Sequence, residues 1–109
     1  LRSKKGIIVQ RFVKIMPHVK IYDGVNVNIN CQIHHGSTIG KFVTLAPASV
    51  NLGNVKIGNY SFIGANTTIK EKVKIGKHCL VGAGSVVVKN VKDYEVVAGS
   101  PARFLRKNK

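Results

Sequence analysis

The sequence has no tryptophan, two cysteines and only 4 acidic residues in 109. Aromatic residues make up 6%, and no motif of an RNA- or DNA-binding domain is present, so we expect no dedicated nucleic-acid partner. No apolar run approaches the ~18 residues of a membrane-spanning helix, and no signal-peptide pattern opens the chain. Two cysteines without such a signal favour a reducing compartment. We therefore expect a cytoplasmic protein with no membrane span.

Positive charge, by contrast, is abundant. The 18 Lys and Arg residues leave a formal net charge of +14. Such a surface favours anionic partners, among them nucleic acid, acidic membrane and phosphorylated small molecules. Hydrophobic residues make up 44%, which is enough for a packed interior, so residues 1–109 are expected to form a single domain.

The dominant pattern is a repeat of six residues. Stepping by six meets an aliphatic residue at every position but one, Asn51: Val9, Ile15, Ile21, Val27, Ile33, Ile39, Leu45, Asn51, Ile57, Ile63, Ile69, Ile75, Val81 and Val87. Four residues after each lies a second column of small or β-branched residues, which runs from Val13 to Val91. Neither column contains a lysine or arginine, and a charge is costly to bury without a partner. Both columns are therefore predicted to face inward.

A period of six fits neither an α-helix nor a simple alternating strand. Three hexads make one triangular coil of about 18 residues, as in hexapeptide β-helices, whose left-handed form is a known exception to right-handed crossovers. We predict an all-β, left-handed parallel β-helix with regular hexads over about residues 9–92 and a C-terminal tail over residues 93–109. Cys31 and Cys79 are separated by a distance that is not a multiple of 18, so they should lie on different faces, without a disulfide.

Four stretches carry a family likeness: VNVNINCQIHHGSTIGKFVTLAPASV, GNVKIGNYSFIGANTTI, VKIGKHCLVGAGSVVVKNV and VVAGSPARFL. They resemble the catalytic half of the sialic acid O-acetyltransferase-like hexapeptide transferases, a group that includes N-acetyltransferases of nucleotide-linked 4-amino-sugars. The resemblance covers residues 6–106. It implies a homotrimeric acyltransferase that moves an acetyl group from acetyl-CoA to an amino or hydroxyl group of a sugar or sugar nucleotide.

Members of the group usually carry a small sugar-nucleotide-binding domain before the β-helix, and these 109 residues contain nothing similar. The expectation is either a fragment or a short relative that binds its acceptor in another way. The sequence leaves open the identity of the acceptor and the choice between O- and N-acylation.

Acetyl transfer from a thioester requires a base, donors for the oxyanion and a site for CoA. The resemblance assigns the base to His35 and an oxyanion-stabilising backbone N–H to Gly53, which lies one coil further along. Asn28 matches an asparagine that orients the acceptor. Nearby Asn51 interrupts the aliphatic column, and a bulge there would free the Gly53 N–H from the strand ladder.

The resemblance also implies a set of cofactor contacts. Ala65 and Ala83 match positions that contact acetyl-CoA through backbone atoms, and Thr44 stands where some members use a CoA-contacting histidine. Arg103 belongs to a basic tail and is a candidate for the CoA phosphates, because the guanidinium fork suits phosphate.

Two features depart from the family pattern, namely Thr44 in place of a histidine and the residue that follows the catalytic histidine. Close relatives carry an acid after the catalytic histidine, and here that place is Gly36. This departure implies a weaker base, and a change of Gly36 to Asp should then raise the basicity of His35. His34 remains an alternative base.

A set of lysines also repeats at multiples of 18 and predicts a ladder on one edge, broken at Thr38: Lys20, Lys56, Lys74 and Lys92. It is either a solvated edge or a channel for the CoA phosphates.

Two other functions remain in view. Carbonic anhydrases with this fold bind Zn²⁺ through three histidines, but the four histidines here lack the required spacing, and we expect no metal. A non-catalytic β-helix scaffold or basic binding module would also fit the +14 charge and the missing acid.

Overall fold

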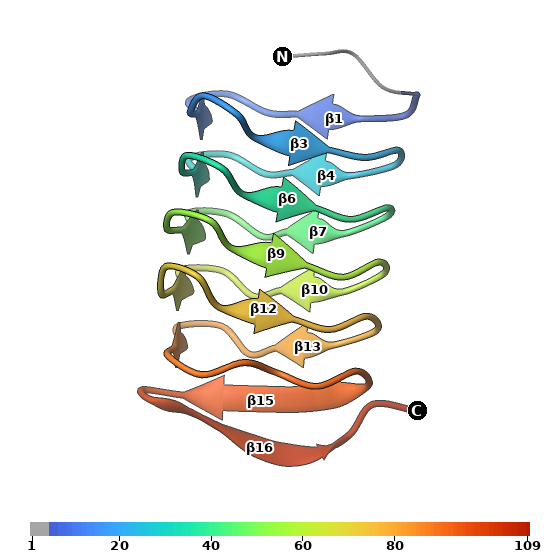
Figure 1. Cartoon of the computed structure of the whole chain (residues 1–109), viewed down its shortest axis with the longest axis vertical. Coiled ribbons are helices and arrows are strands. Elements are labelled where there is room, and N and C mark those ends of the chain that lie inside the picture. Colours follow the sequence, from blue (N-terminus) through green and yellow to red (C-terminus); the bar gives the residue numbers. More distant parts are fainter. Residues whose placement is uncertain (1–4) are drawn as a thin grey trace.

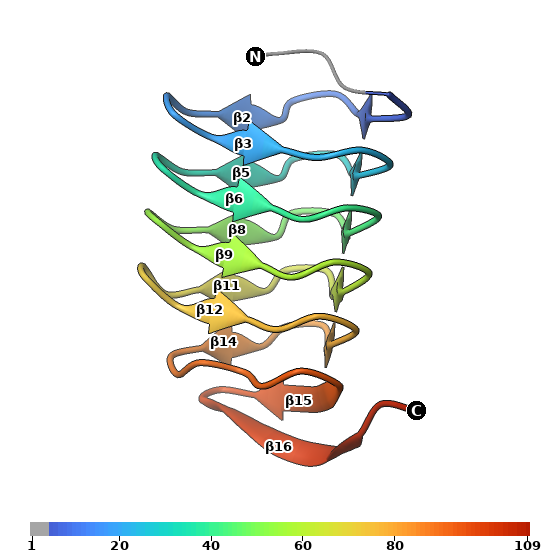
Figure 2. The same ribbon diagram turned by 45° about the vertical axis from the view of Figure 1, so that its right-hand side comes forward.

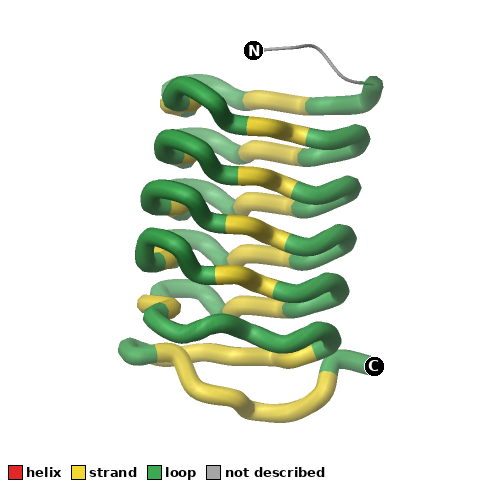
Figure 3. The backbone as a smooth tube through the Cα atoms, viewed as in Figure 1, coloured by secondary structure: helices red, strands yellow, loops and turns green. Residues whose placement is uncertain are grey.

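The computed structural model describes residues 5–109, so the first four residues of the predicted domain lie outside the described residues. The chain winds as a left-handed β-helix of stacked triangular coils, and short strands alternate with turns throughout (Figures 1 and 3). The predicted fold class is confirmed. No helix among residues 5–109 could span a membrane, and the cytoplasmic location stays a prediction.

The strands form three sheets, one on each side of the triangle (Figures 1 and 2). Sheet 1 contains β1 (Ile8–Val9), β4 (Asn26–Val27), β7 (Thr44–Leu45), β10 (Phe62–Ile63), β13 (Leu80–Val81), β15 (Glu95–Gly99) and β16 (Ala102–Lys107). Sheet 2 contains β2 (Lys14–Ile15), β5 (Gln32–Ile33), β8 (Val50–Asn51), β11 (Thr68–Ile69) and β14 (Val86–Val87). Sheet 3 contains β3 (Lys20–Ile21), β6 (Thr38–Ile39), β9 (Lys56–Ile57) and β12 (Lys74–Ile75).

Both predicted columns line the interior. From Ile21 onward the residues of the aliphatic column are at most 3% exposed, and from Val25 onward those of the second column are buried as well. Only the first coil departs from this pattern, since Val9 is 42% exposed and no further coil covers it within the described residues. The hexad pattern arises because each inward side chain packs on its counterparts in the coils above and below.

Asn51 sits in its column without a bulge. Parallel pairing runs from Ile33 through Asn51 to Ile69 in unbroken register, so the expected bulge is wrong. Asn51 is fully buried, and neither its Oδ1 nor its Nδ2 has a hydrogen-bond partner. The amide side chain has the same branching and number of heavy atoms as leucine and fits the column sterically, so its burial costs polar free energy while the backbone pairing stays regular.

The coils meet at three corners, each built from two-residue turns. The histidine corner joins sheets 2 and 3 and contains Pro17–His18, His35–Gly36, Gly53–Asn54 and Glu71–Lys72. The alanine corner joins sheets 1 and 2 and contains Arg11–Phe12, Ile29–Asn30, Pro47–Ala48, Ala65–Asn66 and Ala83–Gly84. The aromatic corner joins sheets 3 and 1 and contains Asp23–Gly24, Lys41–Phe42, Asn59–Tyr60, Lys77–His78 and Asp93–Tyr94. In all of these turns the second residue has a positive φ.

The regular register ends before residue 92. Val91 pairs with Ile75, sixteen residues back, because the last turn of the histidine corner is two residues shorter than the others. The β15–β16 hairpin then closes the lower end of the β-helix (Figure 2). The uninterrupted register predicted to residue 92 is therefore wrong in the last coil.

The same shift shortens the lysine ladder. Lys56 pairs directly with Lys74 in sheet 3, but Lys92 leaves the ladder and its backbone N–H donates to Glu95 Oε1 at 3.0 Å. The sequence analysis predicted a ladder on one edge of the β-helix. The remaining lysines lie instead on the outer face of sheet 3.

Both cysteines are free and buried. Cys31 immediately precedes β5 of sheet 2, and Cys79 immediately precedes β13 of sheet 1. The Cys79 thiol contacts the carbonyl oxygen of Lys92 at 3.0 Å, and burial raises its pKa.

Candidate active site

The predicted base and the predicted oxyanion donor lie at the same corner on adjacent coils. His35 is the first residue of the turn between β5 and β6, and its side chain is exposed. Gly53 occupies the same place between β8 and β9, and the N–H of Asn54 donates to the His35 carbonyl at 2.8 Å. The 18-residue spacing between His35 and Gly53 thus becomes a direct stacking of two turns.

Gly53 is a glycine that the fold does not require. Its φ is not positive, and an added Cβ would meet only the His35 carbonyl oxygen, at 3.7 Å. Gly58 differs, because a Cβ there would lie 2.5 Å from the backbone of Gly76. Within the described residues the Gly53 N–H makes no hydrogen bond, and this follows from its place in the turn without any bulge. The corner therefore offers an unpaired donor beside open space, as close approach of a ligand to the backbone requires.

A second histidine contacts His35. The ring of His18, one coil above, lies with its centroid 5.4 Å from that of His35 at an interplanar angle of 87°. Sequence reasoning placed no role on His18, although its place in the Pro17–His18 turn indicates this proximity.

Gly36 occupies a position where an acid cannot simply be added. Its φ is +75°, and the side-chain oxygen of Asn54 fills the space that a Cβ would need. The expected benefit of a change to Asp is therefore not supported, because Asn54 would have to move and the backbone would be strained. His34, the alternative base, is half-buried, and its Nε2 lies 3.0 Å from Gln32 Oε1.

The predicted cofactor contacts lie elsewhere in the triangle. Ala65 and Ala83 stack at the alanine corner, where the N–H of Gly84 donates to the Ala65 carbonyl at 2.7 Å. Asn28 follows β4 immediately before this corner, and its Nδ2 donates to the Leu45 carbonyl at 3.0 Å. Thr44 lies in β7 of sheet 1.

Arg103 is exposed on β16, in the hairpin that closes the lower end. The full width of sheet 2 separates the histidine corner from the alanine corner. One chain therefore does not bring the two predicted halves of the site together.

Charge is distributed unevenly over the three sides. From the second coil to β14, no strand residue of sheets 1 and 2 and no residue of the alanine corner is charged. Sheet 3 instead presents exposed Lys20, Lys56 and Lys74. The outward-facing Val50 and Val86 of sheet 2 are only half-buried. The uncharged sides are thus the ones suited to contact another protein surface.

Among residues 5–109, no three His, Cys, Asp or Glu side chains gather closely enough to hold a metal ion.

Comparison with known proteins identifies the repeat. Residues 53–89 match the family described as bacterial transferase hexapeptide (six repeats). The chain thus carries the hexapeptide repeat of these bacterial transferases. This agrees with the resemblance that the sequence motifs indicate.

Three solved structures are similar over most of this chain. The acetyltransferase domain of PglB from Neisseria gonorrhoeae is 28% identical over 94% of this chain and 53% of that chain, with a TM-score of 0.87. PerB from Caulobacter crescentus, solved with CoA and GDP-perosamine, is 26% identical over 94% of this chain and 58% of that chain, with a TM-score of 0.77. WeeI from Acinetobacter baumannii is 33% identical over 91% of this chain and 54% of that chain, with a TM-score of 0.77.

The PglB domain has also been solved in complex with acetyl coenzyme A. The chain spans a little over half the length of these relatives.

Proposed function

We propose that this chain transfers the acetyl group of acetyl-CoA to an amino or hydroxyl group of a sugar or sugar nucleotide. The observation that carries the proposal is the histidine corner, where an exposed imidazole and an unpaired backbone N–H lie on adjacent coils. The acetyl-CoA complex of the PglB domain and the PerB complex with CoA and a nucleotide-linked sugar support the choice of substrates.

The chemical step needs only groups at this corner. His35 accepts the proton of the attacking amine or hydroxyl as its nitrogen or oxygen bonds to the thioester carbonyl carbon. The carbonyl electrons move to oxygen, and the Gly53 N–H stabilises the resulting oxyanion. When the carbonyl re-forms, the carbon–sulfur bond breaks, and the thiolate of CoA takes the proton from His35. The products are an acetylated acceptor and free CoA.

A second copy of the chain would complete the site. The catalytic pair and the cofactor alanines lie at opposite borders of sheet 2, so the histidine corner of one subunit would face the alanine corner of its neighbour in a homotrimer. The uncharged surfaces of sheets 1 and 2 are suited to such packing, and the basic sheet 3 would face solvent.

Hybrid trimers test this arrangement. A His35→Ala chain and an Ala83→Trp chain are each expected to be inactive, the second because the bulky ring blocks the cofactor. Random mixing at equal amounts should restore about a quarter of the wild-type sites, because each site takes one corner from each of two subunits. Transfer is followed as CoA thiol release with GDP-perosamine and other nucleotide-linked amino-sugars as acceptors.

A matched mixture provides the control. His35→Ala mixed with Gly53→Val places both defects at the histidine corner. No subunit in this mixture has a wild-type histidine corner, so no activity should return. If neither mixture recovers activity although each single variant is folded and trimeric, the site is not shared between subunits. A wild-type protein that binds no acetyl-CoA in calorimetry at moderate salt would contradict the function itself and favour a scaffold.

A further inference from the structure

The aromatic corner carries a continuous stack of rings. Phe42, Tyr60, His78 and Tyr94 follow one another down the β-helix, with centroid separations of 5.4, 4.9 and 4.9 Å and interplanar angles of 9°, 12° and 4°. Tyr94 continues the stack although the last coil is two residues short, because its N–H still donates to the Lys77 carbonyl at 2.9 Å.

The turns themselves do not need these rings. All four residues have positive φ, between 53° and 65°, which costs about 1–3 kcal/mol for a bulky side chain. Asparagine tolerates this conformation better and holds the same turn position elsewhere, for example at Asn30 and Asn66. Each ring pair contributes only about 0.5–1.5 kcal/mol, so stacking does not clearly outweigh the backbone cost. Fold stability alone therefore gives no reason for the rings.

The two ends of the stack differ. At the upper end the Phe42 ring lies against Gly24, and an added Cβ on Gly24 would collide with Cδ1 and Cε1 of that ring. At that end the Phe42 ring packs on the Gly24 backbone, and Phe42 also lines a smaller pocket there, together with Lys5, Gly6 and Asp23. At the lower end His78 covers one face of Tyr94, and no other ring within residues 5–109 stacks on this residue, which is 42% exposed. Within the described residues, the ladder thus ends at the second face of Tyr94, which no other ring covers.

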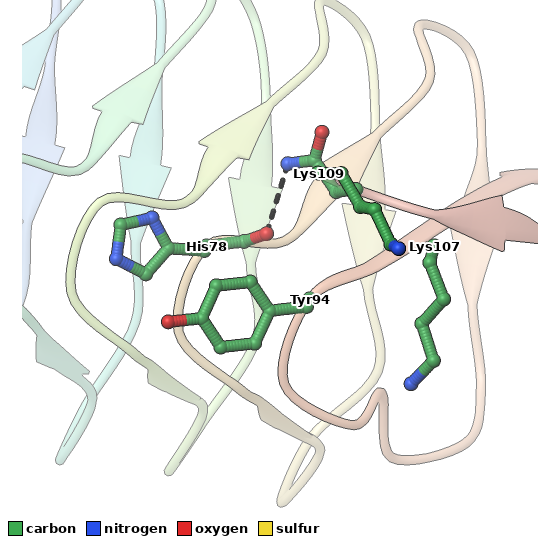
Figure 4. A pocket seen from close by; sticks show the side chains of 5 residues that line it. His78, Tyr94, Lys107 and Lys109 are labelled. Atoms are coloured by element: carbon green, nitrogen blue, oxygen red, sulfur yellow. Dashed lines mark hydrogen bonds between the residues drawn. The ribbon is translucent and has the colours of Figure 1, made fainter.

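The C-terminal segment forms a pocket beside this face (Figure 4). The backbone N–H of Asn108 donates to the Tyr94 carbonyl at 2.7 Å, and its Nδ2 donates to the His78 carbonyl at 2.9 Å. These two bonds hold Lys107 and Lys109 next to the ring. The resulting cavity has a volume of about 760 Å³, within the range of small-molecule sites.

The charged side chains that line the pocket are all positive. No acidic residue lines it, and neither lysine forms an ion pair within the described residues. Lys77 adds a third ammonium group, with Nζ 6.0 Å from the centroid of Tyr94. A planar ring would stack on the free face, and phosphate oxygens would accept hydrogen bonds from the ammonium groups. We infer that this pocket binds a nucleoside phosphate, whose base extends the ladder by one ring and whose phosphates contact Lys107 and Lys109.

This site is separate from the candidate active site. Tyr94 lies at another corner and three coils below His35, which corresponds to about 14 Å along the axis at the usual strand spacing. A nucleotide bound there does not reach His35 of the same chain, so the inference stands independently of acetyl transfer.

The test follows the four histidines by NMR while the chain is titrated with GDP. The ring current of a bound base should shift the His78 signals and leave those of His18 and His35 in place. Tyr94→Asn keeps a residue that tolerates positive φ but removes the terminal ring, and it should weaken GDP binding about tenfold. The double variant Lys107→Gln, Lys109→Gln should also weaken GDP binding, and the loss of affinity should be larger at low salt than at high salt.

Phe42→Asn is the matched control, since it removes one ring from the upper end of the same ladder, far from Lys107 and Lys109. It should leave GDP affinity within about twofold of wild type. The inference is overturned if Phe42→Asn and Tyr94→Asn weaken GDP equally, or if ribose 5-phosphate shifts His78 as strongly as GDP does. It is also overturned if GDP fails to bind at millimolar concentration.

Discussion

The histidine corner and the aromatic corner are built from the same turn, yet they present opposite surfaces. At the histidine corner Gly36 and Asn54 occupy the positive-φ positions and leave open space around His35 and Gly53. At the aromatic corner the same positions carry rings that fill the space between coils. The inward columns therefore determine the course of the backbone. The outward turn residues determine whether the space between the turns of a corner is open to a ligand or filled by side chains.

The largest expected effect concerns the interior on which both corners depend. Ile63→Asp would bury an unpaired carboxylate at a side chain that is fully buried, so no folded protein is expected. Lys72→Asp, at an exposed turn position of the histidine corner, should change the thermal midpoint by only a few degrees. Circular dichroism during heating measures both. Equal effects would mean that the assignment of inward and outward positions is wrong.

Two glycines sharpen the contrast between close packing and open space. Gly58→Ala places a methyl group against the Gly76 backbone and should cost about 1–3 kcal/mol in the free energy of unfolding. Gly53→Ala meets no such obstacle and should change that free energy by no more than about 0.5 kcal/mol. Urea unfolding gives both values. Acetyl-CoA binding should weaken only in Gly53→Ala, and the opposite pattern would remove Gly53 from the proposed site.

A smaller effect is expected from the polar residue behind the histidine corner. The inward strand residues of sheet 3, which precede the aromatic corner, are all isoleucine. Those of sheet 2, which precede the histidine corner, include Asn51 with two unpaired polar atoms. Asn51→Leu should therefore raise the free energy of unfolding by about 1–3 kcal/mol. A loss of stability would show that the amide has a partner in solution.

The hexad period predicted most of the fold because two inward positions in every six residues repeat from β1 to β14. The slip at Val91 could not be found in this way, since a valine fits either inward column and only the backbone pairing with Ile75 decides between them. Phe42, Tyr60 and His78 are spaced by 18 residues, so part of the aromatic ladder was within reach of sequence analysis. Tyr94 was not, because the shortened turn moves it out of that spacing.

The sequence predicted the two parts of the candidate site, the histidine corner and the alanine corner, but not how they come together. His35 and Gly53 share a corner because they lie 18 residues apart, and Gly53 and Ala65 differ because 12 residues place them at different corners. The spacing of residues within one chain does not show which surface faces the histidine corner, since that surface would belong to another copy of the chain. The unpaired Gly53 N–H also follows from turn geometry, which the presence of Asn51 did not indicate.

The most direct test of acetyl transfer at the histidine corner compares CoA release by the wild type, His35→Ala and His34→Ala under the same conditions. If His35 is the general base, His35→Ala should lower turnover by about 10²–10⁴-fold, with acetyl-CoA affinity and thermal stability almost unchanged. His34→Ala should have a much smaller effect. An unchanged rate in His35→Ala would contradict the account, and a collapse in His34→Ala alone would place the base on the neighbouring residue.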